Sequence, residues 1–249
     1  MNIILLSHNE LSRKNTVILA DERHLHVRDV LRGKTGDTVQ CGVVGLSKGE
    51  GEILVTGRHK TEIRYTETGP ADSPLPLSLI VGLVRPIQAR RILKAAAAYG
   101  IGRVLWVPTE LGEKSYAKAG LWQQEAHLPF LLEGASQGGH VRLPEVKVCS
   151  SLEDGISAAG KNGYRLLFHP DTDATGFHDF YSTYRNDAAA EKPPICAAIG
   201  SERGWTERER GLFISEGFVS YRLGPSILRT EDAVHGVLSL LSFVCGEMD

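Results

Sequence analysis

The chain has 249 residues, of which 42% are hydrophobic and 23% are charged, and its formal net charge is −2 at pH 7. This composition is typical of a folded protein with one large domain or two small ones, and it excludes a chain that is disordered throughout. The near-neutral charge gives no global case for a nucleic-acid partner. The four cysteines lack a Cys-x-x-Cys pair, which argues against a disulfide framework or a zinc site.

Residues 1–67 have the pattern of a small β-rich domain. The apolar run at 3–6 has no basic residues before it, so it predicts a first strand rather than a signal peptide. Strand-like runs at 38–44 and 51–56 flank a glycine-containing connection and predict a hairpin. No segment reaches the roughly 20 apolar residues that span a bilayer, so we expect a cytoplasmic protein without a membrane partner.

A short helix is predicted at 21–32, before this hairpin. Leu25, Val30 and Leu31 lie at positions compatible with a core-facing side, and Gly33 is a stop signal. We therefore expect these three apolar residues to pack against the strands of the β-rich domain.

The best domain boundary in the sequence is a linker at 68–76, which is rich in proline and contains a glycine. After it, in a second domain at 77–249, strand-like and helix-like patterns alternate, which predicts an α/β domain with a mostly parallel sheet. The predicted strands include 77–84, 104–107, 164–168 and 195–199, and the predicted helices begin near 86, 121, 150, 206 and 230.

Several of these helices carry start signals. Pro86 suits the first turn of a helix, whereas Pro129 interrupts the predicted helix at 121–138. Ser150 with Glu153, and Thr206 with Glu209, have the spacing of capping boxes. The last predicted helix presents one apolar face, formed by Val234, Val237, Leu238 and Leu241.

Two glycine-containing turns are the most informative features of the chain. The first glycine turn, residues 200–204, follows the apolar run at 195–199, and the second glycine turn, residues 223–231, precedes the last helix. Since the carboxyl ends of parallel strands meet at one edge of a sheet, the two turns predict a small-molecule pocket built from backbone atoms. The loop at 169–173 is expected to form another wall of this pocket.

Missing motifs exclude several common chemistries. The chain lacks the Gly-x-Gly-x-x-Gly fingerprint of nicotinamide enzymes and the phosphate-binding loop of nucleotide hydrolases, and Ser201 is not in a Gly-x-Ser-x-Gly elbow. Asp171 and Asp173 fit the first positions of a calcium loop, but Ser182 stands where that loop needs a glutamate. We predict no metal site, and turn-forming aspartates in a polar loop are the alternative interpretation.

Positive charge is concentrated in one window of the chain. Residues 73–109 contain no acidic residue, and helical spacing places Arg90, Arg91 and Lys94 on neighbouring turns, where they could neutralise phosphates. A solvated helix face that pairs with acidic residues elsewhere is the alternative.

Charged residues in the two glycine turns also have more than one interpretation. Glu202 and Arg203 could pair with each other, contact a partner chain or face a substrate. Arg229 precedes Thr230, a candidate N-cap of the last helix. Its guanidinium could hold a phosphate or the polar edge of a base, or it could pair with Glu231 and Asp232.

Three motifs are distinctive: Leu-Phe-His-Pro at 167–170, Ile-Gly-Ser-Glu-Arg-Gly-Trp-Thr at 199–206 and Leu-Gly-Pro-Ser-Ile-Leu-Arg-Thr-Glu at 223–231. Through them the whole chain resembles the RsmE-type 16S ribosomal RNA uridine-N3 methyltransferases of the SPOUT superfamily. The segment at 26–36 resembles the family's N-terminal PUA-like domain, which binds RNA. The resemblance implies a homodimer, and a C-terminal trefoil knot, which is rare among protein folds.

The resemblance further implies a bent S-adenosylmethionine in the knotted loops and 16S ribosomal RNA, or the small ribosomal subunit, as the partner. The implied cofactor-binding residues are Leu167, Phe168, His169, Pro170, Ile199, Gly200, Ser201, Glu202, Gly204, Leu223, Gly224, Ser226, Ile227 and Leu228. Arg229 is the candidate catalytic residue. The candidate RNA-binding residues are Arg28, Arg32, Arg85, Arg90, Arg91 and Lys94.

The chain departs from the family's pattern mainly at turn and RNA-facing positions. Ser201 and Arg203 replace a proline and a glycine, Ser226 replaces a frequent basic or amide residue, and the segment at 135–139 lacks an expected arginine. Two further hypotheses therefore stand beside uridine-N3 methylation. One is a SPOUT methyltransferase that acts on another RNA nucleotide, and the other is a non-catalytic RNA-binding factor for ribosome assembly.

Overall fold

The computed structural model describes residues 3–170, 175–187 and 193–246. Two compact units are present, the first formed by residues 1–73 and 132–143 and the second by residues 74–131 and 144–249. The chain thus returns to the N-terminal unit at 132–143, which the sequence did not indicate. Strand β5 continues to Pro70 and β6 begins at Leu75, so the extended chain occupies most of the segment predicted as a linker.

The N-terminal unit contains a five-stranded sheet in the order β1-β3-β4-β5-β2. Its strands are β1 (Ile4–Leu6), β2 (Thr16–Leu19), β3 (Thr38–Val43), β4 (Ser47–Thr56) and β5 (Thr61–Pro70). β1 runs parallel to β3 and the other pairs are antiparallel, which confirms the predicted hairpin as β3–β4. The returning segment is joined to this unit by Ser136, whose hydroxyl donates to the Ile3 carbonyl at 2.5 Å.

The predicted N-terminal helix forms with a different phase. Helix α1 (Glu22–Leu25) continues into a π-helical turn, η2 (His26–Val30). Leu25, Val30 and Leu31 are 48%, 66% and 47% exposed, so their prediction as core residues was wrong. The wider π-helical turn alters the 3.6-residue period, and Val27 and His24 are buried instead.

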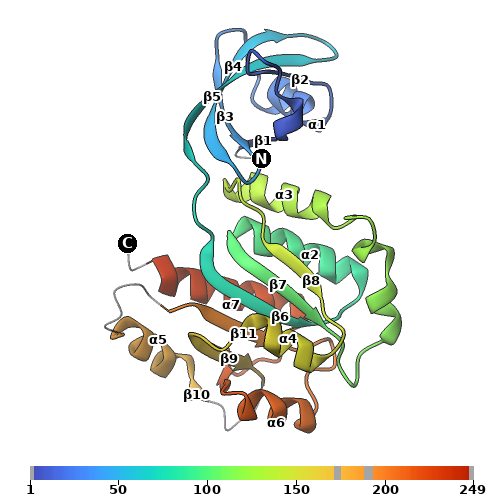
Figure 1. The fold of residues 1–249 in the computed structure, drawn as a ribbon, viewed down its shortest axis with the longest axis vertical. Helices are drawn as coiled ribbons and strands as arrows, with labels where there is room; N and C mark the ends of the chain where they lie inside the picture. Colours follow the sequence, from blue (N-terminus) through green and yellow to red (C-terminus); the bar gives the residue numbers. More distant parts are fainter. Residues whose placement is uncertain (1–2, 171–174, 188–192, 247–249) are drawn as a thin grey trace. The chain divides into compact units, whose positions relative to one another are not determined.

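The C-terminal unit contains a seven-stranded sheet in the order β10-β12-β9-β11-β6-β7-β8 (Figure 1). Its strands are β6 (Leu75–Gly82), β7 (Ile101–Val107), β8 (Glu145–Val148), β9 (Tyr164–Phe168), β10 (Thr175–Gly176), β11 (Ile195–Ile199) and β12 (Val219–Arg222). Every pair between these described strands is parallel. The predicted α/β class with a mostly parallel sheet is confirmed.

The main helices are α2 (Pro86–Ala98), α3 (Leu128–Gly138), α4 (Leu152–Ala159), α5 (Phe177–Arg185), α6 (Glu207–Ser215) and α7 (Thr230–Gly246). Short 3-10 turns occur at η1 (His8–Glu10), η3 (Lys114–Lys118) and η4 (Gly120–Trp122). Pro129 does not interrupt a helix, because α3 begins at Leu128 and the proline occupies its first turn. The capping predicted at Ser150 lies one residue later, where the Ser151 side chain accepts from the Asp154 amide.

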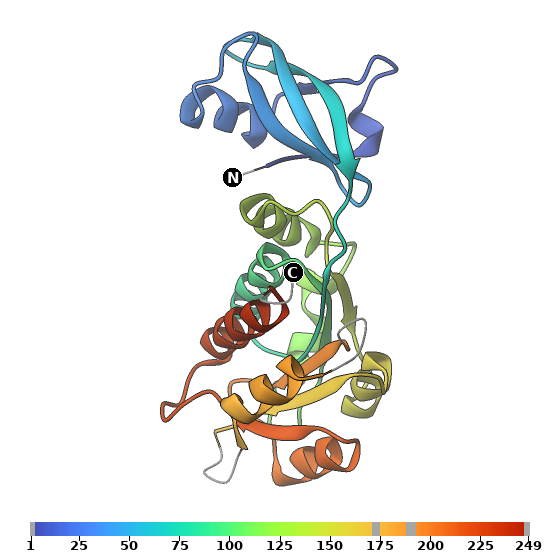
Figure 2. The same ribbon diagram turned by 90° about the vertical axis from the view of Figure 1, so that its left-hand side faces the viewer.

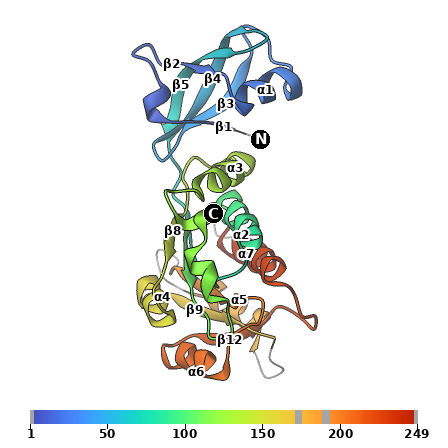
Figure 3. The same ribbon diagram turned by 90° about the vertical axis from the view of Figure 1, so that its right-hand side faces the viewer.

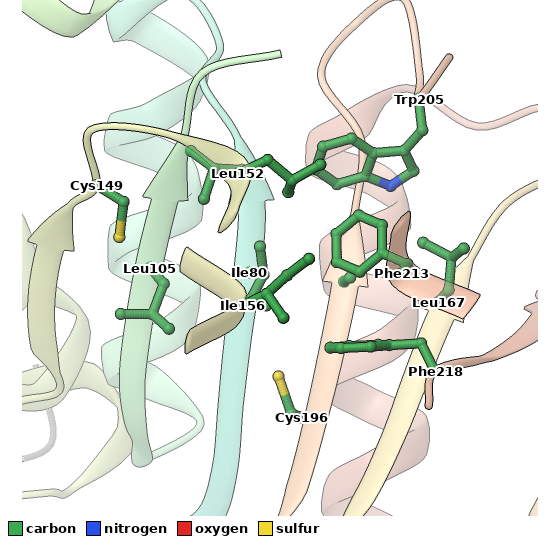
Figure 4. Close-up of a cluster of buried hydrophobic side chains, with 12 residues drawn as sticks. Ile80, Leu105, Cys149, Leu152, Ile156, Leu167, Cys196, Trp205, Phe213 and Phe218 are labelled. Carbon is green, nitrogen blue, oxygen red and sulfur yellow. The ribbon is translucent and has the colours of Figure 1, made fainter. Parts of the chain in front are cut away.

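Helices cover both faces of the parallel sheet. Helices α2 and α7 lie side by side on one face (Figures 2 and 3), and the predicted apolar face of α7 is buried. On the opposite face, residues of α4 and α6 pack against β6, β7, β9 and β11 in one apolar cluster (Figure 4). Because both faces are covered, the central strands β9 and β11 are almost continuously buried rather than alternating. Within the described residues, no helix is both long enough and apolar enough to cross a membrane.

Candidate active site

The strand register brings several loops to one edge of the parallel sheet. Phe168 of β9 pairs with Ile199 of β11, Ile199 with Val81 of β6, and Val81 with Trp106 of β7. These four strands therefore end on one line, and the segments that follow them emerge at the same edge. Open parallel sheets bind their ligands outside this carboxyl edge, so this edge is the candidate site.

The first glycine turn is folded tightly on itself. The Gly204 amide donates to the Ser201 carbonyl at 2.8 Å, and Gly204 has a φ of +69°, which favours glycine. A Cβ on Gly200 would lie 2.8 Å from the Gly204 Cα. The turn consequently needs glycine at both positions, at 200 for the close approach of the two backbone segments and at 204 for the positive φ.

A buried contact holds this turn against the ends of β6 and β7. The Ser201 and Thr109 hydroxyl oxygens lie 3.0 Å apart, and both residues are buried. A Cβ on Gly82, the last residue of β6, would lie 2.5 Å from the Ser201 nitrogen and 2.7 Å from the Thr109 Cγ2. Gly82 thus allows the turn to approach the strand. Glycine inside an apolar strand is a signal for such an approach, so the sequence alone could have assigned Gly82 to the site.

The carboxylate of Glu202 accepts a hydrogen bond from a backbone amide. Its Oε1 accepts from the Arg85 amide at 3.1 Å, at the start of α2. A carboxylate at this position satisfies a free helix N–H and is stabilised by the helix dipole. The Arg85 Nε in turn donates to the Tyr116 hydroxyl at 3.3 Å, an interaction that raises the pKa of Arg85. Tyr116 was not identified from the sequence.

The loop after β9 lies beside the first glycine turn. The His169 amide donates to the Tyr221 carbonyl at 3.1 Å, and the His169 Nε2 is 3.8 Å from the position of a Cβ on Gly204. Leu167, Phe168 and Ile199 are buried, so a ligand at this edge can meet them only through their backbone. Pro170 follows as an exposed residue. Asp171 and Asp173 lie outside the described residues.

The second glycine turn is exposed along most of its length. Ile227 and Leu228 are 85% and 45% exposed, and Ser226 and Arg229 are also exposed. Leu223 and Gly224, which are half-buried, begin the turn, and the Leu223 Cδ1 lies 3.8 Å from the position of a Cβ on Gly236 of α7. The structure therefore ties the start of this turn to α7 and leaves the side chains of 226–229 accessible.

Arg229 lies immediately before α7. Its carbonyl accepts from the Ala233 amide at 2.8 Å, so the helix begins one residue earlier than the predicted N-cap at Thr230 implied. The buried carboxylate of Glu231 is near Arg91, at 3.7 Å from its Nη1. The proposed pairing of Arg229 with Glu231 is therefore replaced by an interaction between Glu231 and Arg91.

The basic residues of α2 divide between two environments. Arg90 and Lys94 lie over the Phe130 ring, 5.2 and 5.7 Å from its centroid, whereas Arg91 faces Glu231. The three residues thus do not share one unpaired surface. Of the N-terminal candidates, Arg28 binds the Asp29 carboxylate and donates to the Arg58 carbonyl at 2.7 Å, and Arg32 is exposed. Within the described residues, no group of His, Cys, Asp and Glu is arranged to hold a metal ion.

Comparison with known proteins gives a family for this architecture. The model of the RNA methyltransferase domain family matches residues 71–242. The ribosomal RNA small subunit methyltransferase E of Treponema pallidum is 35% identical over 240 residues, which cover 94% of this chain and 87% of that protein. The chain belongs to the ribosomal RNA small subunit methyltransferase E family.

Further proteins are similar to this chain in sequence or in fold. Ribosomal RNA small subunit methyltransferase E 1 of Borreliella burgdorferi is 27% identical, with 94% of both chains covered. The structure of the Neisseria gonorrhoeae methyltransferase E bound to S-adenosyl methionine has a TM-score of 0.75, at 20% identity and full coverage of both chains. A methyltransferase from Legionella pneumophila in complex with the same cofactor has a TM-score of 0.74, at 21% identity and 97% coverage of both chains. The family and the fold class inferred from the resemblance are confirmed.

Proposed function

We propose that this member of the methyltransferase E family transfers a methyl group from S-adenosylmethionine to N3 of a uridine in 16S ribosomal RNA. The observation that carries the proposal is the first glycine turn, whose tightly folded backbone lies at the carboxyl edge of the parallel sheet. The family's members are named for the small-subunit ribosomal RNA, and one is bound to this cofactor. A ribosomal substrate implies a cytoplasmic location.

The backbone around the site fits a cofactor of this kind. We assign the cofactor to backbone atoms of 167–170, 199–204 and 223–228. The tight fold of the turn at 200–204 supports the assignment, because it places backbone N–H and C=O groups at the carboxyl edge of the sheet, beside the loop after β9. Bound S-adenosylmethionine supplies an electrophilic methyl group on a sulfonium, and the protein's task is to align the uridine nitrogen with it and exclude water.

Arg229 is the proposed catalytic residue of the chain. Uracil N3 must lose its proton during methyl transfer, so a cation near a uracil carbonyl would stabilise the developing negative charge. The Arg229 side chain is exposed within the second glycine turn, and the neighbouring Glu231 carboxylate faces Arg91. A guanidinium can also clamp a phosphate of the RNA with two hydrogen bonds.

We further propose that the N-terminal unit is a PUA-like domain that docks RNA through Arg28 and Arg32, while Arg85, Arg90, Arg91 and Lys94 contact phosphates near the site. Such contacts predict that the affinity for RNA falls as the salt concentration rises. A homodimer is proposed from the resemblance to the family. The trefoil knot stays a prediction from the resemblance.

The decisive experiment is methylation of small ribosomal subunits from a strain that lacks this protein, with labelled S-adenosylmethionine and mapping of the modified nucleotide. We expect the label at N3 of one uridine. Label at another nucleotide would favour the alternative RNA methyltransferase. RNA binding without incorporation would favour the assembly factor, and calorimetry without cofactor binding would contradict any methyltransferase function.

The role of Arg229 is tested by Arg229→Ala. We expect turnover to fall by about 10²-fold or more, with cofactor affinity within a few-fold of the unchanged protein, since the interaction forms in the transition state. Arg229→Lys retains the charge but not the planar pair of donors, and should restore only part of the activity. Equal losses in turnover and in cofactor affinity would show that Arg229 holds the cofactor instead.

A further inference from the structure

We infer that Glu209 is a positioning residue, which fixes the first glycine turn in its cofactor-binding shape by tying it to the loop after β7. The inference rests on the proposed function for its effect on methyl transfer. The side chain is 2% exposed, and it belongs to α6 rather than to the turn itself. It therefore acts through the backbone and need not touch the cofactor.

Both oxygens of the Glu209 carboxylate are engaged, each by a different segment of the chain. Oε2 accepts from the Thr206 amide at 2.8 Å, and the Thr206 hydroxyl accepts from the Glu209 amide at 3.2 Å, as in the predicted capping box. Oε1 accepts from the amide of Glu110, 99 residues away in the sequence, at 2.8 Å. A capping box needs only one of these oxygens, so helix capping does not account for the second.

The same two segments are joined at further points. The carboxylate of Glu110 accepts from the Thr206 hydroxyl and from the Arg208 Nε, interactions that lower the pKa of Glu110. The buried hydroxyl pair of Thr109 and Ser201 completes the connection. The links at Glu110 and Arg208 are exposed to water and are weakened by it. Glu209 is the buried charged member, so it is the one whose loss should matter most.

Glutamine at this position could not replace the carboxylate. An amide group offers one acceptor oxygen and one donor nitrogen, whereas the two partners of Glu209 are both backbone N–H donors. One N–H would then face the amide nitrogen without an acceptor, and the first glycine turn would lose its fixed distance from the β7 loop. Glu209→Gln thus removes the negative charge of the side chain with little change in its volume.

The test compares Glu209→Gln with Glu207→Gln. Glu207 lies in the same first turn of α6 but is exposed, so its variant makes the same change of charge near the helix N-terminus. For Glu209→Gln we expect cofactor affinity to fall by about tenfold or more, with faster amide hydrogen exchange at 201–206 and an unchanged salt dependence of RNA binding. At saturating cofactor, kcat should recover to within a few-fold of the unchanged protein. The Glu207→Gln protein should match the unchanged protein in all of these measurements.

A second variant keeps the inference testable if Glu209→Gln does not fold. Thr109→Val removes the partner of the Ser201 hydroxyl and leaves the capping box intact, and it should weaken cofactor binding by a few-fold. Unchanged cofactor affinity and unchanged exchange at 201–206 in the folded variants would overturn the inference. The inference would also be overturned if cofactor affinity, RNA binding and melting temperature all fell in proportion. That pattern indicates a merely structural role for Glu209. Failure of the unchanged protein to bind cofactor would instead contradict the proposed function, and the exchange measurement would still test the link.

Discussion

The contact between Gly82 and the first glycine turn makes Gly82→Ala the sharpest test of how the site is built. An alanine Cβ would lie 2.5 Å from the Ser201 nitrogen, 2.7 Å from the Thr109 Cγ2 and 3.1 Å from the Gly200 carbonyl carbon. Two of these atoms are backbone, and the Thr109 side chain is buried and bonded to Ser201. No flexible side chain can therefore move aside to relieve the overlap.

The size of the effect follows from these distances. Non-bonded carbon atoms settle near 3.5–4.0 Å, so the turn must move by about 1 Å. Overpacking of this kind costs about 1–3 kcal/mol of folding free energy, or roughly 2–12 °C in melting temperature for a chain of this size. A displacement of about 1 Å in a positioning group can cost on the order of 10²-fold in function. We therefore expect cofactor affinity to fall by about 10²-fold, a loss of about 2.7 kcal/mol in binding free energy, which is comparable with the loss of folding free energy.

Isothermal calorimetry with S-adenosylmethionine and thermal melting of the same samples measure the two effects. Gly102→Ala is the matched control, because Gly102 lies in β7 of the same sheet and its Cβ would meet its nearest neighbour at 3.5 Å, an ordinary contact. The Gly102→Ala protein should bind cofactor as the unchanged protein does. Normal affinity and melting temperature in Gly82→Ala would refute the argument that this glycine positions the turn.

Two further predictions concern stability. Phe213 is fully buried in the apolar cluster shown in Figure 4, so Phe213→Ala should lower the free energy of unfolding by about 3–5 kcal/mol in urea titrations. Ile214→Ala, at a residue that is 51% exposed, should change the free energy of unfolding by only about 0.5 kcal/mol. Equal losses of stability in the two variants would contradict the assignment of the cluster. In the N-terminal unit, hydrogen bonds from Arg23 lower the pKa values of Glu10 and Asp21 below their usual 4.5 and 3.8. The folded carboxyls thus bind protons less readily than the unfolded ones, so their stabilisation is complete at neutral pH and is lost as the pH falls through the lowered pKa values. Arg23→Gln should reduce this acid dependence in unfolding measurements across pH 2–7, and an unchanged pH profile would count against the interaction.

Local patterns in the sequence were sufficient for much of the fold. The continuous apolar runs at 164–168 and 195–199 predicted buried parallel strands, because such strands are covered on both faces. Thr206 and Glu209 predicted the start of α6, since a capping box involves residues only three positions apart. The glycines of the first turn indicated a close backbone approach, and the structure shows which atoms would collide with a larger residue.

Local patterns failed at two places where the same residues fitted more than one local structure. Leu25, Val30 and Leu31 fitted an amphipathic helix, but a π-helical turn changed the phase and left them exposed. The one-residue error at Ser150 arose in a similar way, because Ser150 and Ser151 offered the same capping chemistry and the adjoining structure selected Ser151.

The sequence by itself determined the family, strands β6, β7, β9 and β11, helices α2, α4, α6 and α7, and the residues of the two glycine turns. Only the tertiary structure decided that the first glycine turn packs against Gly82 and Thr109. It also decided that the second carboxylate oxygen of Glu209 accepts a hydrogen bond from the Glu110 amide. Thr109 and Ser201 are 92 residues apart, and Glu110 and Glu209 are 99 apart. Such contacts form only after the order of strands β11, β6 and β7 has been set, and that order depends on the packing of the whole sheet rather than on any local run of residues.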